Sequence, residues 1–321
     1  MKKRLLAAAV AAAMTMSMGV VMAAPVEFDG MAQLHYRWND YNYQNSDESA
    51  KSTFLLNAKM ALDDNTDLYA RFATQRLHAG FSSADFDTKG DTRDSISTID
   101  RFGFIFKGQD ATFNLGRQGA TIGATALLYS TEGYLGSNKG SIDGVSGIAR
   151  VGATDLSFIA GQENGLNNDK QGDENKLYSL HASYKPADNW TVGGTLARYD
   201  VDGGDATNHW AVDAAYNQGK VGYFAEYTKS NADDKNTAYA IGASYAFDAK
   251  NSFAAIYNKV EANGDIGGWT DFDPNGKGMY YSYNHKLTKD TTFNVFYKDM
   301  KKSDNSAQSY DSFRTTVTYK F

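Results

Sequence analysis

The sequence lacks cysteine altogether, contains only three prolines in 321 residues, and is acidic rather than basic. Without cysteine the chain forms neither disulfides nor thiolate metal sites. Its formal net charge of -6 argues against a nucleic-acid partner, because such partners call for a basic face. The prolines, Pro25, Pro186 and Pro274, lie outside every strand predicted below, so none removes a hydrogen-bond donor from a sheet.

Long apolar runs are also scarce, and the first 23 residues are the exception. Three basic residues at 2–4 precede an Ala-rich apolar stretch at 5–21, and a small-residue cleavage site follows at 21–23. This pattern predicts a secretory signal peptide, residues 1–23, rather than an anchoring helix, because the run is slightly short of the roughly 20 residues that a span needs. No later run is long enough for a transmembrane helix, and nothing divides residues 24–321 into two domains.

Aromatic residues are abundant, with 21 Tyr and 18 Phe, and they recur with a period of two. In the last nine residues, FRTTVTYKF, the odd-numbered positions carry Phe, Thr, Val, Tyr and Phe, and the even-numbered ones carry Arg, Thr, Thr and Lys. One face of this strand is therefore apolar and the other polar. The same alternation recurs in residues 28–38, 54–62, 102–107, 178–185, 210–217, 239–247 and 279–286.

This alternation favours an all-β transmembrane antiparallel β-barrel, in which each strand alternates a lipid-facing apolar residue with a lumen-facing polar one. A soluble β-sandwich shares the period, but its outward face is polar and its inward face aliphatic rather than aromatic. Short turns are predicted near residues 63–67, 108–110, 152–153, 186–189, 218–219, 248–251 and 288–290, and longer loops near residues 39–51, 79–95, 119–142, 164–175, 201–208, 230–236, 262–276 and 302–309. Together they predict sixteen strands, with fourteen as the alternative because residues 111–163 alternate least cleanly.

A signal peptide, sixteen alternating strands, short turns opposite long loops and a last strand ending in Tyr319-Lys320-Phe321 resemble the general diffusion porins of Gram-negative outer membranes. The resemblance covers residues 24–321. It implies an outer-membrane protein in contact with lipid, a homotrimer, and a water-filled channel for ions and small hydrophilic solutes, without a cofactor or enzymatic activity. In that family the barrel-assembly machinery reads the terminal aromatic residue, which implies the same role for Tyr319 and Phe321.

The longest connection, Gly119 to Ile142, reads GATIGATALLYSTEGYLGSNKGSI and is unusually apolar and Gly-rich for an exposed loop. Its place after the fifth strand, preceded by a Gly-Arg step, is similar to the family's third loop, which folds into the barrel and forms the constriction. The alternative is a surface loop packed on a neighbouring subunit. The predicted constriction residues are Gly119, Leu127, Leu128, Tyr129, Glu132 and Asp143.

A cluster of basic residues is expected on the wall opposite this loop. Arg37, Lys59, Arg71 and Arg101 fall on the polar face of the first four strands and Arg314 on that of the last, so closure brings all five onto contiguous wall. The resemblance adds Arg117 and Arg150 by their position relative to the loop. Arg117 shares its parity with Phe113 and Leu115, so an inward side chain there requires a β-bulge. Basic residues facing Glu132 and Asp143 would set a transverse field that penalises apolar solutes, whereas the plainer alternative is solvated lumen charges.

Three further classes of function stay open, and one of them is an adhesin or purely structural barrel, in which an apolar intruding loop has no purpose. A sugar-selective channel would show aromatic residues climbing the inner wall, and the residues of inward parity, Tyr69, Phe224, Tyr280 and Phe296, are scattered. A barrel enzyme would need a serine-histidine pair, which scattered residues do not establish. Residues 271–276 match the first half of a calcium loop, but its twelfth position is Ser282 instead of glutamate, so no metal site is predicted.

Overall fold

The computed structural model describes residues 25–78, 84–86, 94–135, 141–163 and 174–321, and the predicted signal peptide lies outside the described residues. Sixteen antiparallel strands form one closed barrel, in the order β1-β18-β17-β16-β15-β14-β13-β12-β11-β10-β9-β8-β5-β4-β3-β2. The predicted fold and the count of sixteen are thus confirmed. Among the described residues, no helix is long and apolar enough to cross a membrane.

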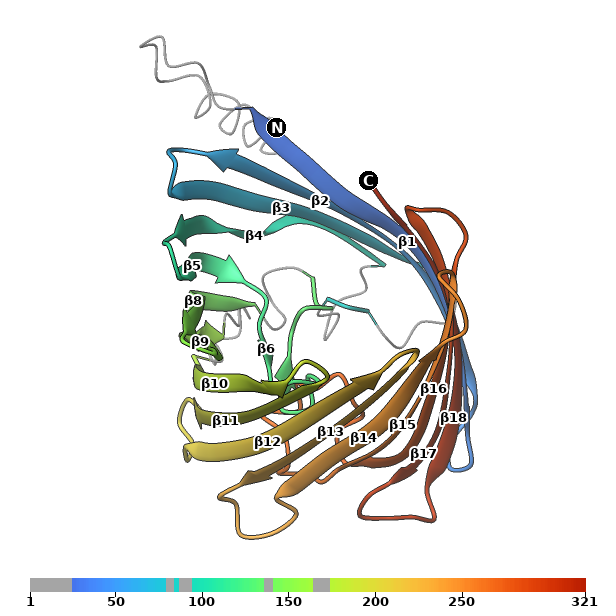
Figure 1. The fold of residues 1–321 in the computed structure, drawn as a ribbon. Helices are drawn as coiled ribbons and strands as arrows, with labels where there is room; N and C mark the ends of the chain where they lie inside the picture. Colours follow the sequence, from blue (N-terminus) through green and yellow to red (C-terminus); the bar gives the residue numbers. More distant parts are fainter. Residues whose placement is uncertain (1–24, 79–83, 87–93, 136–140, 164–173) are drawn as a thin grey trace.

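The strands follow one another along the chain, and neighbours in sequence are neighbours in the sheet. They are β1 (Val26–Tyr41), β2 (Asp47–Ala61), β3 (Thr66–His78), β4 (Ser95–Lys107), β5 (Ala111–Gln118), β8 (Ile142–Val151), β9 (Thr154–Glu163), β10 (Lys176–Ala187), β11 (Trp190–Asp200), β12 (Thr207–Gln218), β13 (Val221–Ser230), β14 (Thr237–Ala246), β15 (Asn251–Val260), β16 (Gly276–Lys286), β17 (Thr291–Lys302) and β18 (Ser309–Lys320). The short pair β6 (Thr121–Ile122) and β7 (Tyr129–Ser130) forms a separate hairpin, and β6 lies inside the ring of barrel strands (Figure 1).

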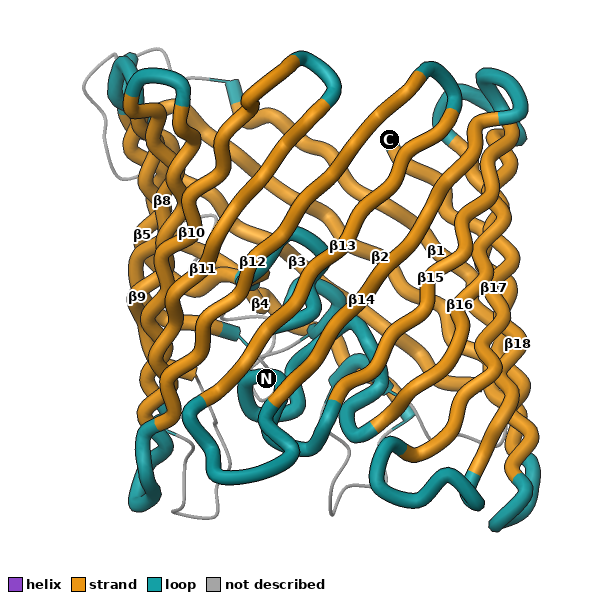
Figure 2. Tube along the Cα trace, turned by 60° about the horizontal axis from the view of Figure 1, so that its bottom comes forward, coloured by secondary structure: helices purple, strands orange, loops and turns teal. Residues whose placement is uncertain are grey.

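The barrel closes where the first strand meets the last. The β1–β18 register runs from Met31 opposite Lys320 to Tyr41 opposite Tyr310. Phe321 extends the pairing, since its backbone N–H donates to the Gly30 carbonyl (3.2 Å) and its carbonyl accepts from the Gly30 N–H (3.0 Å). No strand of the barrel is left with an unpaired edge. The strands run obliquely across the wall (Figure 2).

The outer face of the barrel is apolar, as the alternation predicts. Leu34, Phe102, Leu180 and Ile241 are among the large apolar side chains that are exposed on it. Rings from neighbouring strands meet there, for example Tyr281 and Tyr297 at a centroid distance of 6.2 Å. A surface of this kind is suited to lipid.

Two irregularities interrupt the register, and neither was expected. One lies in β10 between Tyr184 and Ala187, so Pro186, which was predicted to lie in a turn, falls inside β10 at a break in the ladder. The other is a bulge in β4. Arg71 of β3 is paired with Arg101, but the next residue, Phe72, is paired with Ile99, so Asp100 is an extra residue in β4. The exposed positions of β4 accordingly change from odd to even, from Ile99 to Phe102. Asp100 is buried and accepts two hydrogen bonds from Arg71, at 2.8 and 2.6 Å. The bulge thereby places Asp100 and Arg101 next to one another on the inner wall.

Candidate pore constriction

Residues 119–135, the described part of the connection that follows β5, fold into the barrel. Leu127, Leu128 and Tyr129 have no exposed surface. The base of this segment is closed by a backbone hydrogen bond from Thr131 to Ala120, at 2.8 Å. We call residues 119–135 the first inward loop, and its apolar composition is explained by what it buries.

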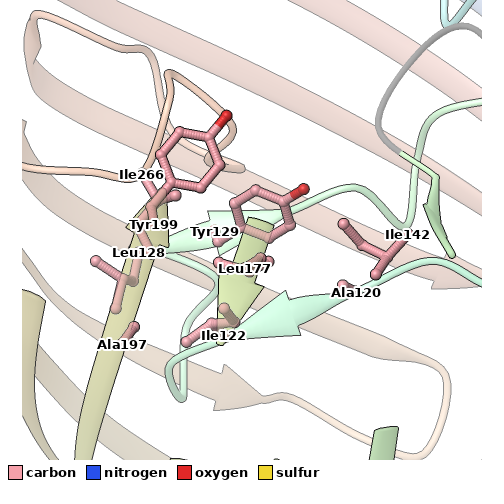
Figure 3. Packing of buried hydrophobic residues seen from close by; sticks show 9 residues of the cluster. All are labelled: Ala120, Ile122, Leu128, Tyr129, Ile142, Leu177, Ala197, Tyr199 and Ile266. Atoms are coloured by element: carbon pink, nitrogen blue, oxygen red, sulfur yellow. The ribbon is translucent and has the colours of Figure 1, made fainter. Parts of the chain in front are cut away.

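The first inward loop packs against one side of the inner wall. Leu128 and Tyr129 belong to a cluster that includes Leu177 of β10 and Tyr199 of β11 (Figure 3). The Tyr129 hydroxyl donates a hydrogen bond to Glu163 at 2.8 Å. Leu127 joins a second cluster with side chains of β14, β15 and β17. The loop therefore rests on the wall from β9 to β17.

On the other side of the loop, a cavity of about 640 Å³ remains between the loop and the wall. Its lining comes mainly from strands β1 to β5 and β8 to β10, together with residues 119–123 and Glu132 of the loop. Lys59, Tyr69, Arg71 and Arg101 are among the wall residues. This cavity is the open part of the lumen beside the loop.

A second segment, residues 261–275 between β15 and β16, also folds inward, and we call it the second inward loop. Sequence reasoning treated it as one more long loop. Its backbone is hydrogen-bonded to the first inward loop, with Ile266 N–H donating to the Leu128 carbonyl (2.9 Å) and Ser130 N–H to the Trp269 carbonyl (2.7 Å). The signal that could have revealed it is the set of apolar residues Ile266, Trp269 and Phe272 in a polar segment. The two inward loops therefore brace each other inside the barrel.

The second inward loop is held to the wall through Asp273. Its carboxylate accepts from Lys298 of β17 (2.8 and 2.9 Å), from the Tyr280 hydroxyl (2.8 Å) and from the Tyr310 hydroxyl. Burial by itself would raise the pKa of Asp273, but the attraction of Lys298 and these hydrogen bonds outweigh it and lower the pKa to about 2. The carboxylate that occupies the third position of the calcium-like segment is therefore ionised and bound by protein donors. Sequence reasoning missed Lys298, whose even-numbered position in β17 matches that of Phe296, a residue it placed on the inner wall.

Five of the predicted basic residues lie on the inner wall. Arg101 reaches the first inward loop, where its Nη1 donates to Glu132 at 2.6 Å. Gly119 allows this close approach, because a Cβ there would lie 2.4 Å from Arg101 Nη2. Arg71 forms an ion pair with Asp100, and Lys59 forms one with Glu27 at 3.0 Å. Arg37 is paired in register with Arg314 where β1 meets β18.

The other two do not line the lumen where they were expected. Arg117 is paired in register with Phe102, which is 50% exposed on the outer face, and its guanidinium lies 5.7 Å from that ring. It binds Asp143 of β8 through two contacts of 2.9 Å, so Asp143 also leaves the predicted constriction. The bulge that an inward Arg117 requires is absent from β5. Arg150 lies two residues before the turn at Gly152 and binds Asp155 at 2.7 Å, away from the loop.

The four aromatic residues predicted on the inner wall, Tyr69, Phe224, Tyr280 and Phe296, form no continuous track. Tyr280 and Phe296 do contact each other, with ring centroids 5.3 Å apart, and Tyr280 stacks on Phe272 of the second inward loop. Tyr280 is buried by this packing and not available to a solute. Tyr69 lies apart on the lining of the large cavity, and Phe224 packs over Gly242.

A protein-family model described as Gram-negative porin matches residues 6–305. The chain belongs to the Gram-negative porin family. This porin is an outer-membrane protein that forms a channel for the diffusion of small solutes, and its family and fold are those of channels rather than enzymes.

Solved porins share the architecture of this porin at low sequence identity. Salmonella typhi OmpF, solved in complex with daunomycin, is 13% identical, with a TM-score of 0.63 over 93% of this chain and 98% of that chain. A mutant of the Rh. blastica porin is 10% identical, with a TM-score of 0.60 over 92% of this chain and 100% of that chain. No curated protein matches the sequence. Identities this low establish the common fold alone.

The second inward loop also contains a buried acid whose ionisation should loosen it. Asp265 is 6% exposed, its Oδ2 has no hydrogen-bond partner among the described residues, and burial raises its pKa to about 7. Because the unfolded segment would ionise near pH 4, the seated loop loses stability as the pH rises from 4 to 7, and its local opening should increase by up to about tenfold per pH unit.

Hydrogen exchange of the amides of residues 261–275 measures this effect in wild type and Asp265→Asn. The ratio of the wild-type rate to the variant rate at the same pH should rise between pH 5 and pH 8. Comparing the two proteins at each pH cancels the intrinsic pH dependence of exchange. A ratio that is constant over this range contradicts the prediction.

Proposed function

We propose that solutes cross the outer membrane between the two inward loops and the wall of β1 to β5. The observation that carries this proposal is the large cavity beside the first inward loop within a closed barrel. The barrel is of the size that leaves an aqueous channel, so whatever narrows it sets what passes.

Charge at the constriction favours hydrophilic solutes. Arg101 and Glu132 meet across it, and Lys51 of β2 binds Asp85 at 2.5 Å nearby. The opposing charges that the sequence predicts therefore meet partly as direct ion pairs. An apolar solute would displace the water around these pairs without replacing its hydrogen bonds, so its entry costs free energy.

A substitution in the ion pair between Asp273 and Lys298, which holds the second inward loop to the wall, tests the proposed route of the solutes. Lys298→Met should leave Asp273 without its cation and release the loop, because a buried charge that loses its partner is strongly destabilised. Single-channel recordings in planar bilayers should then show larger or noisier steps than wild type. Lys289→Met, at an exposed turn, is the matched control for loss of one positive charge. Equal conductance of all three proteins would show that the second loop does not narrow the channel.

We also propose that the face formed by β4, β5 and β8 contacts a neighbouring copy in a trimer. Arg117 is the seventh residue of β5, about 20 Å along the strand from the turn-side end, which tilt reduces to about 14 Å of depth. Near the middle of the roughly 25 Å apolar band, an outward arginine that faces lipid would cost about 2–4 kcal/mol, and the aspartate would cost less. A protein neighbour over Arg117 and Asp143 removes that cost.

A bulky residue on this face should disturb assembly. Leu115→Trp lies on the same face of β5 as Arg117 and is expected to reduce the trimer to smaller species, as measured by light scattering in detergent. Ile241→Trp, at a similarly exposed position on β14, should leave the oligomer unchanged. A wild-type monomer, or a Leu115→Trp variant that stays trimeric, would refute this interface.

The C-terminal strand is proposed as the assembly signal. Tyr319 and Phe321 are exposed on the outer face, where Phe321 stacks on Phe54 at 5.8 Å and Tyr319 at 6.1 Å. Replacing Phe321 with Ala should slow barrel formation in cells several-fold, seen as protein that migrates unfolded on gels without heating. The same variant should refold in detergent nearly as fast as wild type. Equal slowing in both settings would assign Phe321 to packing alone.

A further inference from the structure

A second, smaller cavity of about 310 Å³ lies near the loop-side end of the barrel, beside the seam between β1 and β18. Its lining residues come from β1, the following loop, the second inward loop and the outer ends of β16, β17 and β18. The polar and aromatic side chains that matter are Arg37, Arg314, Lys302, Tyr41, Tyr43 and Tyr310. Asp273 of the second inward loop also lies in this lining.

The cavity lining contains four basic residues and one carboxylate, and Asp47, outside the lining, also attracts Arg37. Arg37 and Arg314 are directly opposite one another in the β1–β18 register, an arrangement in which like charges repel. Lys301 and Lys302 are the other two basic residues of the lining. The one carboxylate of the lining, Asp273, is engaged by Lys298. Among the described residues Arg314 forms no ion pair with a carboxylate; its Nε donates to the Ser312 hydroxyl at 3.1 Å.

Two arginines held side by side match the geometry of an oxyanion. A guanidinium presents its donors in a rigid fork that binds phosphate through two parallel hydrogen bonds, and an anion between two such forks cancels their repulsion. A bound anion therefore offsets the electrostatic repulsion between the two guanidiniums.

Three tyrosines form the rest of the recognition surface. Tyr41 lies 5.5 Å from Tyr43 and 5.6 Å from Tyr310 between ring centroids, so the rings form a continuous group beside the arginines. Tyrosine rings combine a flat apolar face with a hydroxyl, which suits the ring of a sugar. The cavity volume is at the lower end of the 300–1,000 Å³ typical of small-molecule sites and exceeds what a bare phosphate needs.

We propose that this cavity is a capture site for phosphorylated sugars on the loop side of the constriction. The phosphate binds between Arg37 and Arg314 with Lys302 nearby, and the sugar ring lies against Tyr41, Tyr43 and Tyr310. The site deepens the proposed channel function and rests on it, since it concentrates one class of hydrophilic solute at the entrance.

The test uses the detergent-purified full-length porin and three probes: glucose 6-phosphate, glucose and inorganic phosphate. Calorimetric titration reports binding without requiring conduction, and bilayer recordings report block of the ion current. Glucose 6-phosphate should bind saturably and block the current, and its affinity should exceed that of either other probe at least tenfold. Arg314→Gln and Arg37→Gln should each weaken its binding at least tenfold.

Two variants separate the parts of the site. Tyr43→Ala should weaken glucose 6-phosphate binding but not phosphate binding, and Lys289→Gln, at the exposed turn, should alter neither. Unchanged binding in both arginine variants overturns the proposal, and so does equal affinity for glucose or for inorganic phosphate. A protein that binds glucose 6-phosphate but does not conduct would refute the channel function and leave the site intact.

Discussion

The structure depends on one requirement, which is that every backbone donor and acceptor in the membrane finds a partner within the protein. A sheet satisfies it only when its first and last strands pair, because an open edge would leave a row of unpaired groups in hydrocarbon. The β1–β18 register meets it, and Phe321 continues the pairing to the last residue. Because backbone hydrogen bonds hold the closed sheet together, the outer side chains can face lipid and the inner side chains can shape the lumen.

The lumen of such a barrel is wide, and the two inward loops narrow it. The first inward loop does so with leucine and tyrosine packed against small residues of the far wall, such as Ala197 and Ala238. The second inward loop is tied down by charge, through Asp273 and Lys298. Apolar packing and a buried ion pair respond differently to conditions, because only the latter depends on ionisation. The two loops share backbone hydrogen bonds, so a change at one is transmitted to the other.

Sequence reasoning reached the fold because alternation with a period of two is a local signal that every strand repeats. It reached the first inward loop because Leu127, Leu128 and Tyr129 are out of place in a solvated segment. It misplaced Arg117 because the position of this residue relative to the loop was given more weight than the odd–even pattern of β5. In the structure Arg117 follows that pattern and lies on the same outer face as Leu115. The bulge at Asp100 and the ion pair of Lys298 with Asp273 both depend on contacts between residues far apart in the sequence. Each depends on which residues of another strand or loop arrive opposite, and no single segment carries that information.

The closing seam also explains why a binding site would arise at that place. Arg37 and Arg314 come from opposite ends of the chain and meet only in the finished barrel. A site that needs both therefore exists only in molecules whose closure is complete. In the incomplete barrel the two guanidiniums are apart and their repulsion is absent, so the pair opposes closure unless an anion or solvent screens it. The cavity that adjoins the pair is where an anion that offsets this repulsion would bind.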